Sequence, residues 1–341
     1  MTITSGVYAI RAFLRVDGST VPVTEMKVSL PAERKSATWS AEVPIDSLPA
    51  DRSEAYWAKE NPKKVECICS VDGVETVLLA GTVDKLSAPL AETKIALSGR
   101  CLSAMLHEKR AREKFQNKKP EDIIKDLAGR VGLSTDLGDF GLKAGRFVQI
   151  DWAELAHGHS YSEILDKMCV DVGARWWIEG DKLTVRIDPA SDVYSVDYKR
   201  GTPDQSDAMR VSIERNFQAA RPAKVTTAGW DERKKAKVHS TANVSGVGST
   251  REYHYEHHGV SPERASKHSK AKAKEHARHE FVCTVKIAGD LTVNRAKKLR
   301  LTGNIYAQDY DIESVSHEIA QHGGFVTSIS AKSAKKGRKV K

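Results

Sequence analysis

Apolar and polar residues alternate with a period of two through the first hundred residues. Between Val7 and Val16 every even-numbered position is apolar or aromatic, while Arg11 and Arg15 fall on the opposite face, as in a half-buried strand. Similar segments follow, with a good hairpin turn at Asp72-Gly73, over residues 25–30, 37–43, 65–71, 77–86 and 94–99. Because no helical periodicity appears before residue 100, residues 1–100 are predicted to form a small antiparallel β-barrel, which exposes no free sheet edge.

The hydrophobic period changes after residue 100. A helix with a continuous apolar stripe is predicted to begin at Pro120, a favourable first position. A second helix begins at Ser160, where Glu163 three residues later completes a capping box. The pattern over residues 175–187 predicts a hairpin. We therefore expect residues 101–190 to form a compact α+β module.

The polar stretch 191–208 is predicted to be a linker. Strand patterns return over residues 209–330 and predict a second small antiparallel barrel, interrupted by a basic loop and helix insertion at 245–280. The helix of this insertion, at 262–279, lacks a wide apolar stripe, so we expect it to lie mostly in solvent or against a partner protein. Residues 331–341 are predicted to be a disordered basic tail. The expected fold class is mainly β, with two small antiparallel barrel domains flanking a small α+β domain.

Composition narrows the class of protein. The chain has 341 residues, 40% apolar and 29% charged, which is typical of a soluble globular protein with two or three cores. The N-terminal segment has no basic n-region, and two arginines interrupt its apolar run, which argues against a signal peptide and a membrane span. The five cysteines are scattered and form no C-x-x-C pair, which favours buried free thiols in a protein made in a reducing cytoplasm. The net charge of +9 arises entirely after residue 190.

Three segments occur in a fixed order along the chain. They are Gly99-Arg-Cys-Leu-Ser-Ala-Met-Leu-His107 with residues 113–128, Ser160-Tyr-Ser-Glu-Ile-Leu-Asp-Lys-Met168 with Gly173-Ala-Arg-Trp-Trp177, and Tyr310-Asp-Ile-Glu-Ser-Val-Ser-His-Glu318 with Gly323-Gly-Phe-Val-Thr-Ser-Ile329. Together they resemble the late control D family of phage tail proteins, from about residue 99 to 330. No single motif is diagnostic, but the ordered set is fairly specific. The family includes baseplate hubs of tailed phages and the base of type VI secretion spikes.

The resemblance implies a homotrimer in which each chain contributes two similar barrels of the tail-tube type. Six barrels in a ring would join a six-fold tail tube to a three-fold spike around a central channel. The implied partners are the tail tube or distal tail protein, the central spike protein and the tape measure protein, with transient passage of DNA through the channel and no membrane insertion. The protein would be made in the host cytoplasm and reside in the virion baseplate.

The sequence departs from the family in two ways. Residues 246–279 are unusually basic, and the chain ends soon after the second barrel. We therefore expect separate proteins to supply the spike and hydrolase functions.

Two histidine clusters raise the question of a metal site. His317, Glu318 and His322 resemble a zincin motif, but that motif needs two histidines four residues apart on a helix, whereas these are five apart in a strand pattern. The segment from His254 to His258 has no cysteine or second cluster near it in the sequence, so a solvated loop is favoured over a metal site. We therefore expect no metal ion and no cofactor.

Carboxylates offer one alternative function. Asp309, Asp311 and Glu313 fall on one face of a predicted strand, and paired carboxylates can perform acid/base chemistry or bind calcium. A tail-associated peptidoglycan hydrolase is therefore an alternative, although a polar strand face is favoured because no aromatic cleft accompanies them. The segment from Ser245 to Ser249 lacks the lysine and flanking elements of a phosphate loop and is interpreted as a linker. No catalytic residue is assigned, and the protein is expected not to be an enzyme.

Basic side chains offer the other alternative, a nucleic-acid-binding accessory protein. They occur in the run 233–237, in the C-terminal tail, and along the predicted helix at Arg264, Lys267, Lys270, Lys272, Lys274 and Arg278. Such charge could bind phosphates non-specifically, but the segments carry no interleaved aromatics and no recognisable reading helix. Docking onto an acidic partner subunit would explain the charge equally well, so the baseplate hub is the first hypothesis.

Overall fold

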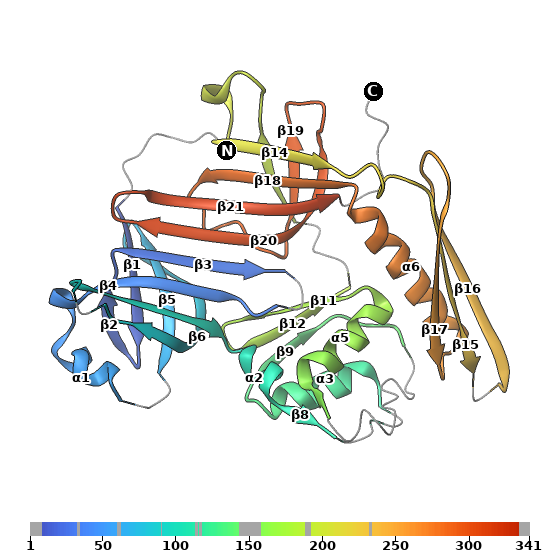
Figure 1. The fold of residues 1–341 in the computed structure, drawn as a ribbon, viewed down its shortest axis with the longest axis horizontal. Helices are drawn as coiled ribbons and strands as arrows, with labels where there is room; N and C mark the ends of the chain where they lie inside the picture. The colour runs from blue at the N-terminus through green and yellow to red at the C-terminus, as the bar shows by residue number, and fades with distance from the viewer. Residues whose placement is uncertain are drawn as a thin grey trace.

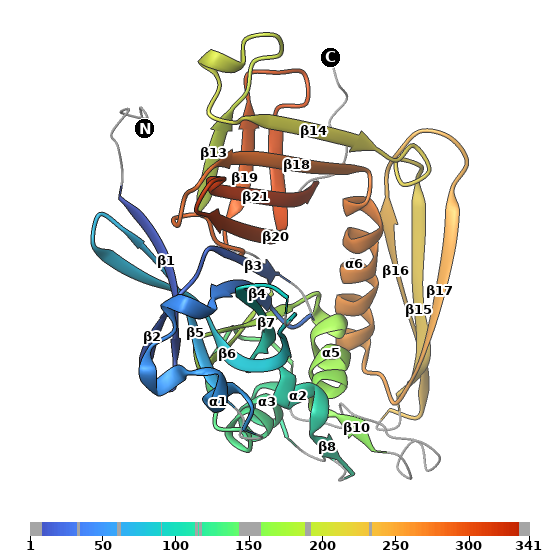
Figure 2. The ribbon, with the colours of Figure 1, turned by 60° about the vertical axis from the view of Figure 1, so that its left-hand side comes forward.

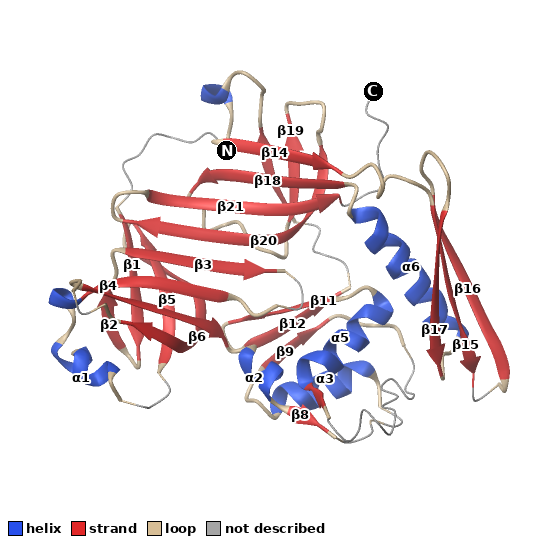
Figure 3. Cartoon of the chain, in the orientation of Figure 1, coloured by secondary structure: helices blue, strands red, loops and turns tan. Residues whose placement is uncertain are grey.

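The computed structural model describes residues 9–333 except 33–34, 60–62, 90, 113–114, 116–117, 143–157, 188–191 and 232–233. Strands dominate: a β unit from each end of the chain, an α+β unit beside the first and below the second, and a smaller sheet at one side make up the molecule (Figures 1 and 3). The prediction of a mainly β protein with an inserted α+β unit is confirmed. Among the helices described, none combines the length and apolar character needed to cross a bilayer.

The first β unit follows the alternating pattern closely. Asp72 and Gly73 both have positive φ, as the predicted tight turn between β5 and β6 requires. Leu14, Trp39 and Leu97 point into its core. Its elements are β1 (Ile10–Val16), β2 (Ser19–Pro22), β3 (Glu25–Pro31), β4 (Thr38–Pro44), β5 (Lys64–Val71), β6 (Val74–Ser87) and β7 (Lys94–Cys101), with the short helices η1 (Ile45–Ser47), η2 (Ala50–Arg52) and α1 (Glu54–Trp57).

The α+β unit contains both predicted helices and the predicted hairpin. At the start of α5, Ser160 Oγ accepts a hydrogen bond from Glu163 N, and a Glu163 side-chain oxygen accepts one from Ser160 N, which forms the expected capping box. Gly173 ends that helix in the left-handed conformation. The elements are α2 (Ala104–Glu108), β8 (Arg110–Ala111), α3 (Pro120–Gly129), β9 (Ser134–Leu137), β10 (His159–Ser160), α5 (Tyr161–Val172), β11 (Arg175–Glu179) and β12 (Lys182–Arg186).

The second β unit begins earlier than the sequence pattern indicated. The stretch predicted as a linker contains β13, which pairs in parallel with β19 and buries Val196 completely. Flanking turn residues obscured this short strand. Residues 331–333 of the predicted disordered tail continue β21, while 334–341 lie outside the described residues. The elements are β13 (Val193–Asp197), η3 (Pro203–Gln205), β14 (Arg210–Arg215), β18 (Phe281–Ala288), β19 (Lys298–Thr302), β20 (Gln308–Ala320) and β21 (Gly324–Ser333).

The insertion is a separate sheet with a helix, which corrects the prediction of a basic loop and helix at 245–280. Its elements are β15 (Ala223–Asp231), β16 (Ala236–Val244), β17 (Arg251–His258) and α6 (Pro262–Arg278). β17 pairs in parallel with β15, and β15 and β16, which were assigned to the second barrel, pair only within this sheet among the described strands. α6 stands between the sheet and α5 (Figure 2).

α6 is not mostly in solvent, contrary to the expectation. It buries Ala265, His268, Ser269 and Ala273. These residues recur at helical spacing, but because they are small or polar they do not appear as an apolar stripe. Small side chains allow the helix to approach its neighbours closely, so the signal for packing was residue size and not hydrophobicity.

One strand joins the two β units. β20 pairs with β21 on one edge and with β3 on the other, in register from Ser314 opposite Pro31 to Ala320 opposite Glu25. A single 13-stranded sheet therefore runs through both units, with β14 and β2 at the ends of its main path. The sequence pattern did not predict this continuity, because strand pairing between distant segments leaves no local signal.

Candidate functional site

The three units meet around a buried arginine. Arg295 is only 4% exposed; it donates a hydrogen bond from Nη1 to the carbonyl of Pro31 at 3.0 Å and another from Nη2 to the carbonyl of Ile178. Burial lowers its pKa, but an arginine remains protonated at neutral pH, so the guanidinium is a buried charge that depends on these carbonyls. This residue of the second β unit thereby bridges the first β unit and the α+β unit.

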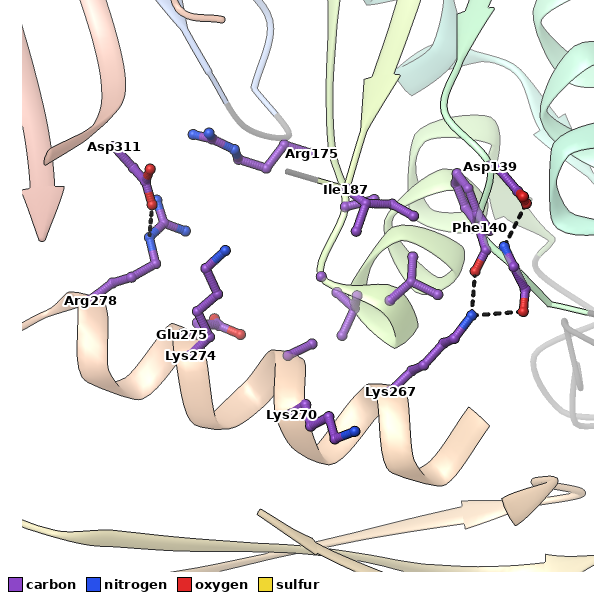
Figure 4. Close-up of a pocket in the computed structure, with 16 residues that line it drawn as sticks. Asp139, Phe140, Arg175, Ile187, Lys267, Lys270, Lys274, Glu275, Arg278 and Asp311 are labelled. Carbon is purple, nitrogen blue, oxygen red and sulfur yellow. Dashed lines mark hydrogen bonds and ion pairs between the residues drawn. The ribbon is translucent and has the colours of Figure 1, made fainter. Parts of the chain in front are cut away.

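A pocket of about 400 Å³ lies between α5, the start of β11, α6 and β20 (Figure 4). One wall is α6, which contributes Lys267, Lys274 and Arg278, and Arg175 and Ile187 extend from the opposite side. The lining residues include Phe140, Val172, Gly173, Ala174, Lys270, Ala271 and Lys274. The pocket therefore lies at the junction of the insertion, the α+β unit and the second β unit.

Most of the basic side chains on the predicted helix, now α6, have hydrogen-bond or ion-pair partners within the chain. Lys267 Nζ donates to the carbonyls of Phe140 and Gly141 at 2.7 Å each (Figure 4). The other pairs are Arg264 with Asp171, Lys272 with Glu275, and Arg278 with Glu313 and Asp311. Basic side chains in internal ion pairs are not available for neutralising phosphates. The main role of α6 is therefore to connect the insertion to its neighbouring units.

The predicted carboxylate group is also engaged. Asp309 contacts Arg300 at 2.7 Å, Asp311 is buried beside Arg278, and Glu313 contacts both Arg278 and Lys332. A register shift between Ile312 and Ser314 interrupts the alternation of this strand, so the three carboxylates do not form one regular face. Each has a basic partner, which favours a structural role over acid/base chemistry.

The two histidine segments have different environments. His317 is buried on β20, confirming the strand context, and its Nδ1 lies 3.0 Å from Thr327 Oγ1. His322 lies exposed in the turn after the strand and not on a helix. The segment from His254 to His258, expected to be a solvated loop, is in fact strand β17. The segment from Ser245 to Ser249 connects β16 to β17, consistent with a linker.

The fold brings together one cluster with metal-ligand chemistry. His257 of β17, His268 of α6 and Asp171 of α5 place one ligand atom each within 4.8 Å of the others. Burial lowers the pKa of His268 to about 3, so its ring is neutral at physiological pH. Burial raises the pKa of Asp171, and the adjacent Arg264 opposes that rise. His257 belongs to the segment from His254 to His258, for which the sequence favoured a solvated loop over a metal site because no second cluster lies near it in the sequence. The fold supplies the other two members, Asp171 and His268, from separate elements.

The cysteines match the prediction of buried free thiols. All five are buried and none forms a disulfide. Burial raises the pKa of Cys69 to about 11 and that of Cys283 to about 12, so these thiols stay protonated and unreactive at neutral pH.

Solved structures show what this fold is. No protein-family model matches the sequence, and no curated protein sequence matches it. A tail protein from Neisseria meningitidis superposes with a TM-score of 0.74 at 14% identity, covering 95% of this chain and 97% of that one. A 43 kDa tail protein of prophage MuSo2 from Shewanella oneidensis gives 0.72 at 14% identity, covering 95% and 98%.

A second group of similar structures comes from type VI secretion. An Escherichia coli component of that system, which itself exhibits structural similarity to the bacteriophage T4 tail proteins gp27 and gp5, gives a TM-score of 0.59 at 8% identity, covering 96% of this chain and 77% of that one. The chain therefore has the fold of phage tail proteins and of type VI secretion components, over nearly its whole length. At these identities the likeness establishes the fold and leaves function to be argued from the molecule.

Proposed function

We propose that the chain is the structural hub of a phage or phage-like tail baseplate. As a homotrimer it would form a pseudo-six-fold ring that joins a six-fold tail tube to a three-fold spike around a central channel, through which DNA could pass. Its partners would be the tube or distal tail protein, the spike and the tape measure protein, and it would reside in the virion. Its function would lie in its interfaces and not in catalysis.

The pairing of β20 with β3 carries this proposal. It holds two β units of one chain side by side in one sheet, so that three chains would supply six such units. The buried Arg295 fixes the same junction through hydrogen bonds to both neighbouring units. A six-position ring built from three chains requires each chain to hold its two β units in a fixed relation to each other.

The outer edge of the sheet supplies a possible contact between subunits. β14 ends the main path of the 13-stranded sheet, and large apolar side chains flank it: Met209 is 61% exposed and Phe217 is 72% exposed. An open strand edge with exposed apolar residues is an interaction surface that monomeric proteins normally avoid. We place the contact with the next subunit at β14.

The mass of the purified protein in solution, measured by light scattering across a range of salt, tests the proposal. We expect a trimer of about three times 37.6 kDa that persists at high salt, because strand edges and apolar contacts are little screened. A monomer at every salt concentration and protein concentration would contradict the trimer.

A DNA-binding accessory function is the main alternative. The internal ion pairs of α6 argue against it, because four of its basic residues already have partners within the chain. Retention of double-stranded DNA that falls log-linearly with salt would favour this alternative. Release of muropeptides from cell walls would instead favour a hydrolase.

A further inference from the structure

We propose that Asp171, His257 and His268 bind one divalent transition-metal ion, for which zinc is the best chemical match. The site does not depend on the proposed tail function. It would clamp the insertion, through β17 and α6, onto α5 of the α+β unit. The argument rests on the spacing of the ligand atoms, on the groups that orient them and on the donor types.

The two histidines already have the separation that a metal ion requires. Their Nε2 atoms lie 3.2 Å apart, and the rings cross at 71°. Two nitrogens bound to one tetrahedral zinc at about 2.0–2.1 Å lie about 3.3 Å from each other. With the Asp171 carboxylate, all three ligand atoms fall within 4.8 Å. Small side-chain rotations would bring the three to coordination distance.

Thr227 orients His268 from the other side of the ring. Its Oγ1 lies 3.0 Å from His268 Nδ1, and its side chain is completely buried. A proton on Nδ1 donated to this hydroxyl leaves the Nε2 lone pair directed at the cluster. Histidine ligands of metal ions regularly make such a second hydrogen bond, which fixes the ring and its tautomer.

Arg264 orients Asp171 in the same way as Thr227 orients His268. Arg264 Nε donates to Asp171 Oδ2 at 2.8 Å, and both side chains are largely buried. A carboxylate has two oxygens, so Asp171 can accept from the guanidinium through one and ligate through the other. The arginine opposes a bound cation electrostatically, but it also holds the carboxylate ionised and in place. His257 is only half-buried, which gives an ion a route to the site.

The donor set selects the class of metal. Two imidazole nitrogens and one carboxylate suit zinc and its transition-metal neighbours, whereas calcium and magnesium prefer oxygen ligands alone. Three protein ligands would leave one position for water. Because the ligands come from the α+β unit and from two elements of the insertion, binding would couple directly to the docking of the insertion.

The test uses full-length protein without an affinity tag, stripped with a chelator and titrated with zinc chloride by calorimetry, with metal analysis after dialysis. We expect one zinc per chain. His257→Gln should weaken zinc binding by about 100-fold or more, because it removes a ligand while keeping a polar side chain. His254→Gln is the matched control: this histidine is on the same strand, exposed, and should leave affinity unchanged.

Two further measurements keep the test decisive if His257→Gln folds poorly. Thr227→Val should weaken binding about 10–100-fold by releasing the His268 ring, with all three ligands still present. Cobalt(II) bound to the unaltered protein should give the intense visible absorption of a tetrahedral site. Absence of stoichiometric zinc, a weak octahedral cobalt spectrum, or equal affinity in the His257 and His254 variants would overturn the proposal and leave His257 and His268 as a simple hydrogen-bonded pair.

Discussion

Arg175 donates a hydrogen bond from Nη1 to the main-chain carbonyl of Ile312 at 3.0 Å, although the two residues lie 137 positions apart. Arg175 begins β11 of the α+β unit, and Ile312 lies on β20, the strand that also pairs with β3. β20 therefore contacts the first β unit through its ladder and the α+β unit through a buried guanidinium. β20 and the arginines Arg175 and Arg295 thus connect three units of the chain.

Arg295→Met is expected to destabilise the protein by about 2–4 kcal/mol. The substitution roughly keeps the volume of the side chain but leaves the part-buried carbonyl of Pro31 and the buried carbonyl of Ile178 without this donor. Denaturant unfolding measures the change. Arg300→Met, which removes an exposed ion pair with Asp309, is the control and should change little. Equal effects in both variants would contradict the bridging role of Arg295.

Gly99→Ala should destabilise the first β unit by about 1–3 kcal/mol, whereas Gly129→Ala should be neutral or stabilising by up to about 1 kcal/mol. A Cβ atom at Gly99 would collide with the carbonyl oxygen of Thr82, while one at Gly129, at the end of α3, would meet nothing within 4 Å. Thermal unfolding of the two variants compares the same chemical change in two environments. A neutral Gly99→Ala would show that the strands do not approach as described.

Stability should fall in acid partly through His317. Burial lowers the pKa of His317 to about 4, against about 6.5 in an unfolded chain. As the pH falls, the unfolded state takes up a proton on this histidine before the folded state does. The contribution of His317 to the unfolding free energy is therefore fully present above about pH 6.5 and is lost between about pH 6.5 and 4. The loss amounts to up to about 3 kcal/mol.

His317→Gln should flatten the dependence of unfolding free energy on pH in that window, since glutamine can still contact Thr327 but does not titrate. His322→Gln is the matched control: this histidine is exposed, and its replacement should leave the pH dependence of the unfolding free energy unchanged. A His317→Gln profile as steep as that of the unaltered protein would mean that folding does not shift the pKa of His317.

Replacing the apolar residues beside β14 should weaken the proposed subunit contact. Met209→Glu and Phe217→Glu are expected to shift the protein from trimer to monomer in light scattering, because they place charge at the open sheet edge. Val247→Glu changes a still more exposed apolar residue, on the insertion, and should leave the trimer intact. Trimers unaffected by the first two substitutions would move the contact away from β14.

Local patterns predicted many of the regular elements, although β13 and β17 were missed. The capping residues Ser160 and Glu163 and the apolar stripe of α3 identified two helices, and the turn at Asp72-Gly73 identified a hairpin. These features work because each depends only on neighbouring residues along the chain. The mainly β class followed from the same alternation.

The junctions could not be predicted in this way. The register of β20 against β3, the buried position of Arg295 and the meeting of Asp171 with His268 depend on residues far apart in the sequence. A buried arginine and an exposed one look alike in a sequence, and β13 was hidden by the turn residues around it. A stripe of small residues on α6, from Ala265 to Ala273, was the one local sign of close packing that could have been used.

The symmetry of the particle tests the central proposal most directly. Cryo-electron microscopy of the purified oligomer should show a three-fold ring around an open or plugged channel, with the two β units of each chain alternating at six quasi-equivalent positions. Particles with a single chain, a two-fold dimer, or a ring in which only one β unit per chain lines the channel would contradict the proposed hub.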